Sequence, residues 1–126
     1  MSVATWFVFV LGAGLGAPLR FLVDAEVEHR STHPRPHGTL VVNAAGSLVL
    51  GVVTALALRG EVSDGALTVI GVGFCGALTT FSTFAVETVR LLEDGAVDHA
   101  FKNAVLHATI AIGAAAIGYA VVLNVA

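Results

Sequence analysis

The chain has 126 residues, of which 56% are hydrophobic and 12% are charged, with a net charge of −3 and a mean hydropathy of +0.90. A water-soluble domain of this size carries roughly twice that share of charged residues, so a soluble globular fold is excluded. No basic run points to nucleic acid, and the single cysteine, Cys75, cannot form an internal disulfide.

The charged residues lie in short segments between four long apolar stretches. Residues 1–19, 38–58, 65–86 and 103–126 contain no Asp, Glu, Lys or Arg. Each stretch is about 20 residues long, which is the length a helix needs to cross about 30 Å of hydrocarbon. The sequence therefore predicts an all-α membrane protein with four transmembrane helices in a single domain, 1–126. The expected helices are approximately 4–23, 38–58, 65–90 and 101–124, with both termini on one side of the membrane.

The first predicted helix is expected to be retained as a span. Residues 1–7 contain no Lys or Arg, so the positive segment of a secretory signal is missing. Gly12 and Gly16 form a GxxxG pair, which packs helices closely either within the subunit or between subunits. Arg20 stands at the end of the span, where a side chain that reaches to the interface is the ordinary explanation.

The second predicted helix starts after Pro34 and Pro36, which disfavour helix in the residues before them. Asn43, Ser47 and Thr54 are spaced so that they share one stripe of this helix. Their amide and hydroxyl groups either join neighbouring helices or donate hydrogen bonds to a desolvated anion, and the sequence leaves both uses open.

The third predicted helix has an unusual composition at its centre. Gly71, Gly73 and Gly76 weaken the helix, and the hydroxyl residues that follow compete for backbone hydrogen bonds: Thr79, Thr80, Ser82 and Thr83. We expect a break near the bilayer midplane, the alternative being a continuous helix. A break frees carbonyl groups in a low-dielectric medium, where a bound cation or a neighbouring subunit would have to satisfy them.

Aromatic and charged residues follow the expected break. Phe81 and Phe84, three residues apart, lie on one face; their positive ring edges either face an anion or pack against lipid and other helices. Glu87 lies near the end of this span, where snorkelling is again the ordinary explanation. In the fourth predicted helix Asn103 and His107, four residues apart, form a second polar stripe.

The distribution of positive residues predicts one orientation in the membrane. Loops one and three, with their flanks, carry five positive residues, whereas the side that holds the termini carries one, Arg59. The positive-inside rule then places loops one and three in the cytoplasm and the termini outside. The five are Arg20, Arg30, Arg35, Arg90 and Lys102.

Three segments of the sequence resemble the Fluc (CrcB) family of small fluoride channels. They are residues 12–20 (GAGLGAPLR), 38–46 (GTLVVNAAG) and 73–87 (GFCGALTTFSTFAVE), and the resemblance extends over all four spans. It implies an antiparallel dimer of four-helix subunits with two narrow pores that pass fluoride and reject chloride. Passive export of fluoride would lower its toxicity in the cytoplasm. The location implied is the inner (plasma) membrane of a bacterial or archaeal-type cell.

The resemblance also implies roles for individual residues. Phe81 and Phe84 would line the anion path, with Asn43 as the pore amide. The carbonyls of Gly76 and Thr79 would bind a structural sodium ion at the dimer interface. The resemblance implies less specific roles for eight further residues. Thr80, Ser82 and Thr83 would contribute hydroxyls near the path, and Arg20 would lie near a pore vestibule. Other candidates for the pore or a polar track beside it are Glu87, Asn103, His107 and Ser47.

Two features depart from the family pattern. Many relatives carry a tyrosine and serines in the fourth helix where this chain has Asn103, His107 and Ala111. The strong positive bias is unlike a subunit that inserts in both orientations. The second subunit is therefore expected to be either a copy of this chain or an oppositely oriented paralogue.

Other function classes fit the sequence less well. A proton-coupled multidrug exporter of four helices needs a carboxylate inside the membrane, and the helix centres contain none. An intramembrane hydrolase would have to pair Ser82 with His107 without any accompanying nucleophile motif. There is no GxxxxGK[ST] motif for a nucleotide. The expected partners are fluoride, the bilayer and a second subunit, and no enzymatic activity is expected.

Overall fold

The computed structural model describes residues 2–30 and 37–125, and these residues are almost entirely helical. The long helices are α1 (Val3–Arg30), α2 (His37–Leu58) and α6 (Val97–Asn124). The third span, Asp64–Glu93, consists of four shorter pieces: α3 (Asp64–Leu67), η1 (Thr68–Cys75), α4 (Gly76–Leu78) and α5 (Phe81–Glu93). Four segments are thus long and apolar enough to cross a membrane, which confirms the predicted fold class. Pro34 and Pro36 lie outside the described residues.

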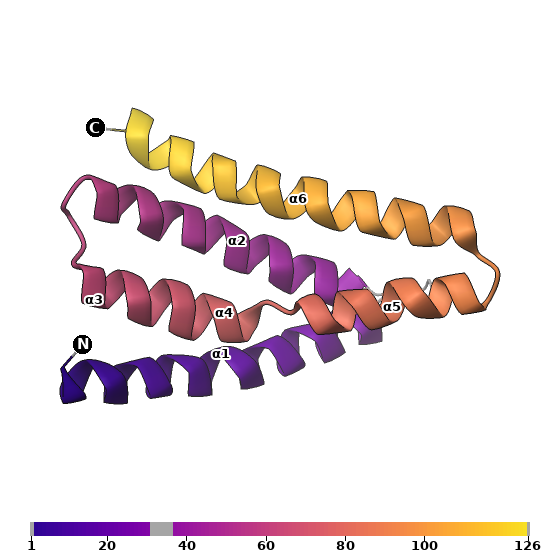
Figure 1. Cartoon of the computed structure of the whole chain (residues 1–126), viewed down its shortest axis with the longest axis horizontal. Helices are drawn as coiled ribbons and strands as arrows, with labels where there is room; N and C mark the ends of the chain where they lie inside the picture. The colour runs from indigo at the N-terminus through magenta and orange to yellow at the C-terminus, as the bar shows by residue number, and fades with distance from the viewer. Residues whose placement is uncertain (1, 31–36, 126) are drawn as a thin grey trace.

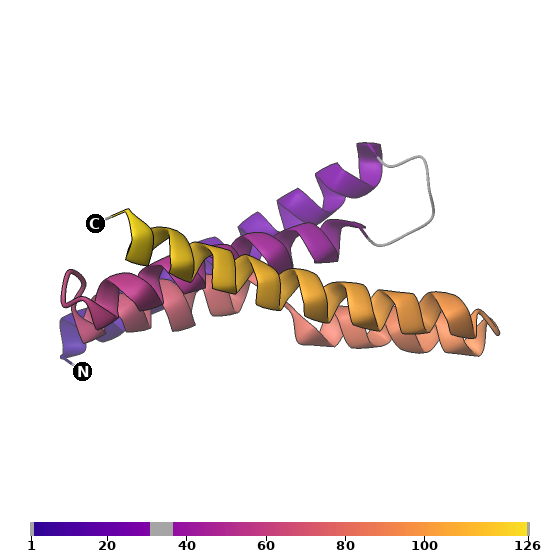
Figure 2. The ribbon, with the colours of Figure 1, turned by 90° about the horizontal axis from the view of Figure 1, so that it is seen from above.

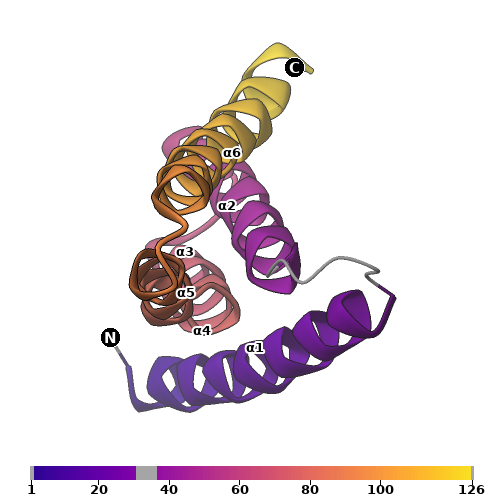
Figure 3. The same ribbon diagram turned by 90° about the vertical axis from the view of Figure 1, so that its right-hand side faces the viewer.

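The four spans lie side by side, with α2 and the third span between α1 and α6 (Figures 1 and 3). Both termini are at the same end of the bundle, as predicted. In the most apolar part of each span, between 6% and 28% of the residues are buried inside the subunit. Most apolar side chains therefore point outward, where lipid or another subunit covers them.

Helix α1 continues seven residues beyond the predicted end at residue 23, to Arg30. The additional turns carry Asp24, Glu26 and Glu28, and an ion pair joins Glu26 to Arg30 four residues later. Such a pair supports a solvated helix, so the charged segment does not have to become a loop where the apolar stretch ends. In Figure 2 this end of α1 diverges from α5 and α6.

The GxxxG pair of α1 packs within the subunit, against the third span. A Cβ atom on Gly12 would lie 3.2 Å from the carbonyl oxygen of Val69, and one on Gly16 would lie 2.5 Å from that of Phe74. Both glycines therefore allow backbone-to-backbone contact. Of the two alternatives that the sequence left open, packing inside the subunit is the one observed.

Helices α2 and α6 approach each other through two further glycines. A Cβ atom on Gly51 of α2 would overlap the backbone carbonyl of Ala115, and one on Gly118 of α6 would overlap that of Leu48. Because lipid removes the hydrophobic drive for helix association, this close packing is what stabilises the pair.

The third span is broken at its middle, as predicted. η1 has wide turns, in which the N–H of Gly76 bonds to the carbonyl of Gly71 five residues earlier. After α4 the backbone is extended at Thr79 (φ −83°, ψ 159°) and Thr80 (φ −148°, ψ 121°). Thr80 then caps α5, because its hydroxyl oxygen accepts a hydrogen bond from the N–H of Thr83 at 3.2 Å.

Candidate functional site

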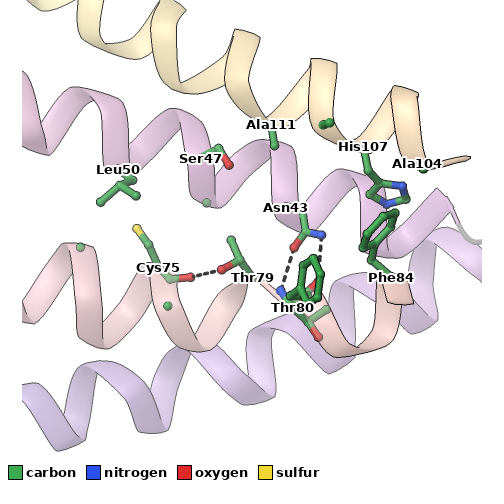
Figure 4. A pocket seen from close by; sticks show the side chains of 15 residues that line it. Asn43, Ser47, Leu50, Cys75, Thr79, Thr80, Phe84, Ala104, His107 and Ala111 are labelled. Carbon is green, nitrogen blue, oxygen red and sulfur yellow. Dashed lines mark hydrogen bonds between the residues drawn. The ribbon is translucent and has the colours of Figure 1, made fainter. Parts of the chain in front are cut away.

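An open groove of about 360 Å³ lies beside the break, between α2, the third span and α6 (Figure 4). Gly46, Gly71, Ala104, Ala108 and Ala111 contribute little side-chain volume and keep it open. Eight of the residues predicted for the site line the groove: Asn43, Ser47, Gly76, Thr79, Thr80, Phe81, Phe84 and His107.

Asn43 joins α2 to the break through two hydrogen bonds (Figure 4). Its Oδ1 accepts from the backbone N–H of Thr80 at 2.8 Å, and its Nδ2 donates to the carbonyl of Thr80 at 3.0 Å. The carboxamide thus takes the place of helical backbone partners that the extended residues lack. One N–H of Nδ2 remains for another acceptor.

The break leaves several backbone carbonyls without helical partners. The N–H of Thr80, which a continuous helix would direct to Gly76, donates to Asn43. Within the described chain no backbone N–H donates to the carbonyls of Gly76, Ala77 or Leu78. The carbonyl of Thr79 accepts from Nη1 of Arg20 at 3.3 Å.

These oxygens suit a cation held by main-chain carbonyls, since such groups can replace the water around an alkali ion. Gly76 is exposed at the groove, and its oxygen is the freer of the two predicted ligands. Thr79 keeps one lone pair beside the Arg20 bond. The residues present therefore fit the group that the sequence predicted, although the described residues contain no cluster of His, Cys, Asp or Glu side chains for a metal.

Three aromatic rings form a row from α5 to α6. The ring centroids of Phe81 and Phe84 are 5.6 Å apart with an interplanar angle of 57°, and those of Phe84 and His107 are 4.8 Å apart at 49°. Phe81 is 79% exposed in the isolated subunit and His107 is 6% exposed. The exposed Phe81 thus begins the row, and the buried imidazole ends it.

The hydroxyl residues after the break bond to one another. Oγ1 of Thr80 is 3.2 Å from Oγ of Ser82 and 3.0 Å from Oγ1 of Thr83. Ser82 and Thr83 do not line the groove, whereas Thr80 does. Among the described residues no hydrogen bond joins Ser82 to His107.

Three softer candidates lie outside the groove lining. Glu87 accepts a hydrogen bond from the hydroxyl of Thr39 at 2.6 Å. Nη1 of Arg20 donates to the carbonyl of Thr79 in the broken span at 3.3 Å. Nδ2 of Asn103 donates to Oγ1 of Thr88 at 3.0 Å.

Thr39, which is 1% exposed, was not among the predicted site residues. It stands four residues before Asn43, so it extends the polar stripe of α2 by one turn. The four-residue spacing of Thr39, Asn43 and Ser47 is the sequence signal that indicates Thr39.

Comparisons with known proteins show the family to which the chain belongs. The family model described as CrcB-like protein, Camphor Resistance (CrcB), matches residues 7–119. A relative from Nocardia farcinica, "Fluoride-specific ion channel FluC 1", is 49% identical over 105 residues, covering 83% of this chain and 71% of the relative. "Fluoride-specific ion channel FluC 1" of Streptomyces avermitilis is 43% identical over 90% of this chain and 91% of its own length. "Fluoride-specific ion channel FluC 2" of Mycobacterium tuberculosis is 43% identical over 94% of this chain and 90% of its own length. The family model matches most of the chain, and four helices are long and apolar enough to cross a membrane. The chain is therefore a multi-pass membrane protein that belongs to the CrcB-like family.

Proposed function

We propose that this chain is a subunit of a fluoride-selective channel, which exports the anion passively and lowers its toxicity in the cytoplasm. The observation that carries the proposal is the groove, in which the Phe81–Phe84 ring pair and the Asn43 amide lie beside a broken helix. Fluoride-specific relatives cover most of the chain. The membrane potential drives export, and is worth about 2.3 kcal/mol per charge per 100 mV.

Fluoride is small, strongly hydrated and a good acceptor of hydrogen bonds. The remaining N–H of Asn43, the hydroxyl of Ser47 and the positive edges of Phe81 and Phe84 supply donors and partial positive charge along the groove. None of these groups carries a full charge, so the anion is bound weakly enough to leave again. A narrow path excludes the larger chloride.

Polar residues beside the groove extend the path toward the membrane surfaces. Arg20 attracts the anion at a vestibule, while Glu87 and Asn103 continue a polar track. The hydroxyls of Thr80, Ser82 and Thr83, already bonded to one another, keep the start of α5 polar next to the ring pair. His107 ends the row of rings on α6.

The channel has two antiparallel subunits. The groove is open in the single subunit, and Phe81 is 79% exposed there, so a second subunit is needed to enclose the anion path. The carbonyls of Gly76 and Thr79 would hold a structural sodium ion at the interface, which would supply the positive charge that broken-helix carbonyls need in a bilayer.

The second subunit is an oppositely oriented paralogue. Five of the six Lys and Arg residues lie in or beside loops one and three, and one, Arg59, lies near the termini. Such a bias fixes one orientation, whereas an antiparallel pair needs both. Expressing the chain alone with a reporter tag at each terminus tests this, and tags found on both sides of the membrane would contradict it.

Fluoride efflux from liposomes tests the proposed function. Liposomes contain this chain alone or together with an oppositely biased relative, and a fluoride electrode follows the efflux. Phe81→Ile removes the ring edge and is expected to abolish efflux. The control is Phe101→Ile on α6, which should leave efflux unchanged because Phe101 is similarly exposed (70%) but outside the groove. Comparable efflux of chloride, or full activity of Phe81→Ile, would refute fluoride selectivity through this groove.

A further inference from the structure

His107 is a buried imidazole at the end of the row of rings, and one of its nitrogens has no partner. Its side chain is on α6 and 6% exposed. Nδ1 lies 3.1 Å from the carbonyl oxygen of Asn103, while Nε2 is buried without a hydrogen-bond partner among the described residues.

The contact with Asn103 settles which nitrogen carries the proton in the neutral form. A carbonyl oxygen can only accept, so Nδ1 must be the donor. In neutral His107, Nε2 then carries a lone pair and no hydrogen. Protonation adds the second hydrogen at Nε2 and makes the ring a cation, without requiring the Nδ1 contact to change.

The imidazole contacts Phe84 directly. Their centroids are 4.8 Å apart, inside the separation of about 6 Å over which a cation interacts with an aromatic ring. A cation on this side draws the ring electrons of Phe84 toward itself. The edges of Phe84 that face away from His107 then become more positive and attract an anion more strongly.

Few other ionisable groups lie near this imidazole. Cys75 is the only other titratable residue among those that line the groove on α2, η1, α4, α5 and α6. The charged residues of the packed helices are all outside that lining: Glu87, Arg90 and Glu93 on α5, and Asp98 and Lys102 on α6. Helix α2 has none between residues 38 and 58. Protonation of His107 therefore changes the charge of the groove from zero to +1.

We infer that His107 is a positioning residue behind Phe84 whose protonation increases fluoride conduction through this groove. The inference rests on the proposed fluoride channel and adds a dependence on pH to it. Because only the protonated imidazole is a cation, conduction rises as the pH falls. His107 acts through Phe84 and needs no contact with the anion.

The test measures fluoride efflux from liposomes at symmetric pH values between about 5.5 and 8, with protein-free liposomes correcting for leakage of neutral HF. From the strength of such cation–ring contacts we expect the wild-type rate to rise about threefold to tenfold toward low pH. His107→Gln and His107→Phe cannot become cations here and should give flat profiles. His99→Gln is the matched control: His99 is on the same helix but exposed and outside the groove, so its profile should follow the wild type.

A second measurement does not depend on conduction. The ring resonances of Phe84, labelled with ¹³C, should titrate with the same midpoint as the His107 imidazole in the wild-type protein. This measurement tests whether protonation of His107 affects the Phe84 ring, even if both His107 variants fold poorly.

The possible outcomes distinguish failure of the His107 inference from failure of the proposed channel function. A wild-type rate that does not change with pH, or a profile shared by wild type and both His107 variants, overturns the inference and leaves the channel intact. A Phe84 signal that does not follow His107 overturns it as well. No fluoride efflux at any pH from liposomes that hold a complete channel overturns both.

Discussion

The hydrogen bonds between Asn43 and Thr80 allow one prediction to be worked out in detail. Asn43→Ala removes both partners of the Thr80 backbone, the acceptor at 2.8 Å and the donor at 3.0 Å. Thr80 is 8% exposed, so water does not readily replace them. Each unsatisfied group costs about 1–3 kcal/mol, and since the adjacent groove admits some water we expect a total of about 2–4 kcal/mol.

Hydrogen exchange at the Thr80 amide is the direct assay. At about 1.4 kcal/mol per factor of ten, Asn43→Ala should speed this exchange by about 30-fold to several hundred-fold, and the protein should unfold at a lower temperature in detergent. Asn43→Asp keeps an acceptor for the N–H but loses the donor to the carbonyl, so its effect should be smaller.

Ser47→Ala is the control for that series. Ser47 lies one turn further along α2 and lines the same groove, but it forms no hydrogen bond to another described residue and should leave Thr80 exchange unchanged. Equal Thr80 exchange in Asn43→Ala and wild type would refute the idea that this amide holds the broken span together.

Three further outcomes follow from the packing and the groove. Gly118→Leu should prevent folding because its side chain would overlap the backbone of α2, and size-exclusion chromatography should then show aggregation. Gly113→Ala is the control: nothing lies within 4 Å of the added Cβ atom, so this variant should fold normally. Thr39→Val removes the donor to Glu87 and should destabilise the protein by about 1–3 kcal/mol in a denaturant titration, while Thr39→Ser should cost much less; equal stability of the two would argue against this bond. Phe81→Leu should keep the wild-type unfolding temperature because the ring is 79% exposed, yet lose fluoride efflux; a large loss of stability would mean that Phe81 serves the core of the subunit.

The spans and the break could be predicted from the sequence because each has a local cause. The apolar stretches have the length of the bilayer, and the glycines and hydroxyls around Gly76 weaken the third helix where they stand. The end of α1 was harder to predict, since charged residues such as Asp24 and Glu28 are compatible with both a loop and a solvated helix. In this chain the helix continues to Arg30.

The partners of the polar groups depend on packing between distant segments, which the sequence does not reveal. The sequence left open whether Asn43 joins neighbouring helices or donates to an anion. In the structure both ends of its side chain meet the backbone of Thr80, 37 residues away. The ordinary explanation of Arg20 was a side chain that reaches the membrane interface. In the structure its guanidinium donates to the carbonyl of Thr79, 59 residues away. The packing of α1 and α2 against the third span brings these residues together.

The order of Asn43 and Thr80 along the chain bears on how the protein is made. Asn43 belongs to α2, which precedes the third span in the chain and so leaves the ribosome before it. The amide is therefore already in place when the extended residues of the third span arrive, and their exposed backbone need not wait in lipid for a later helix. Moving α2 behind the third span by circular permutation would remove this advantage, and insertion should then stall at the broken span.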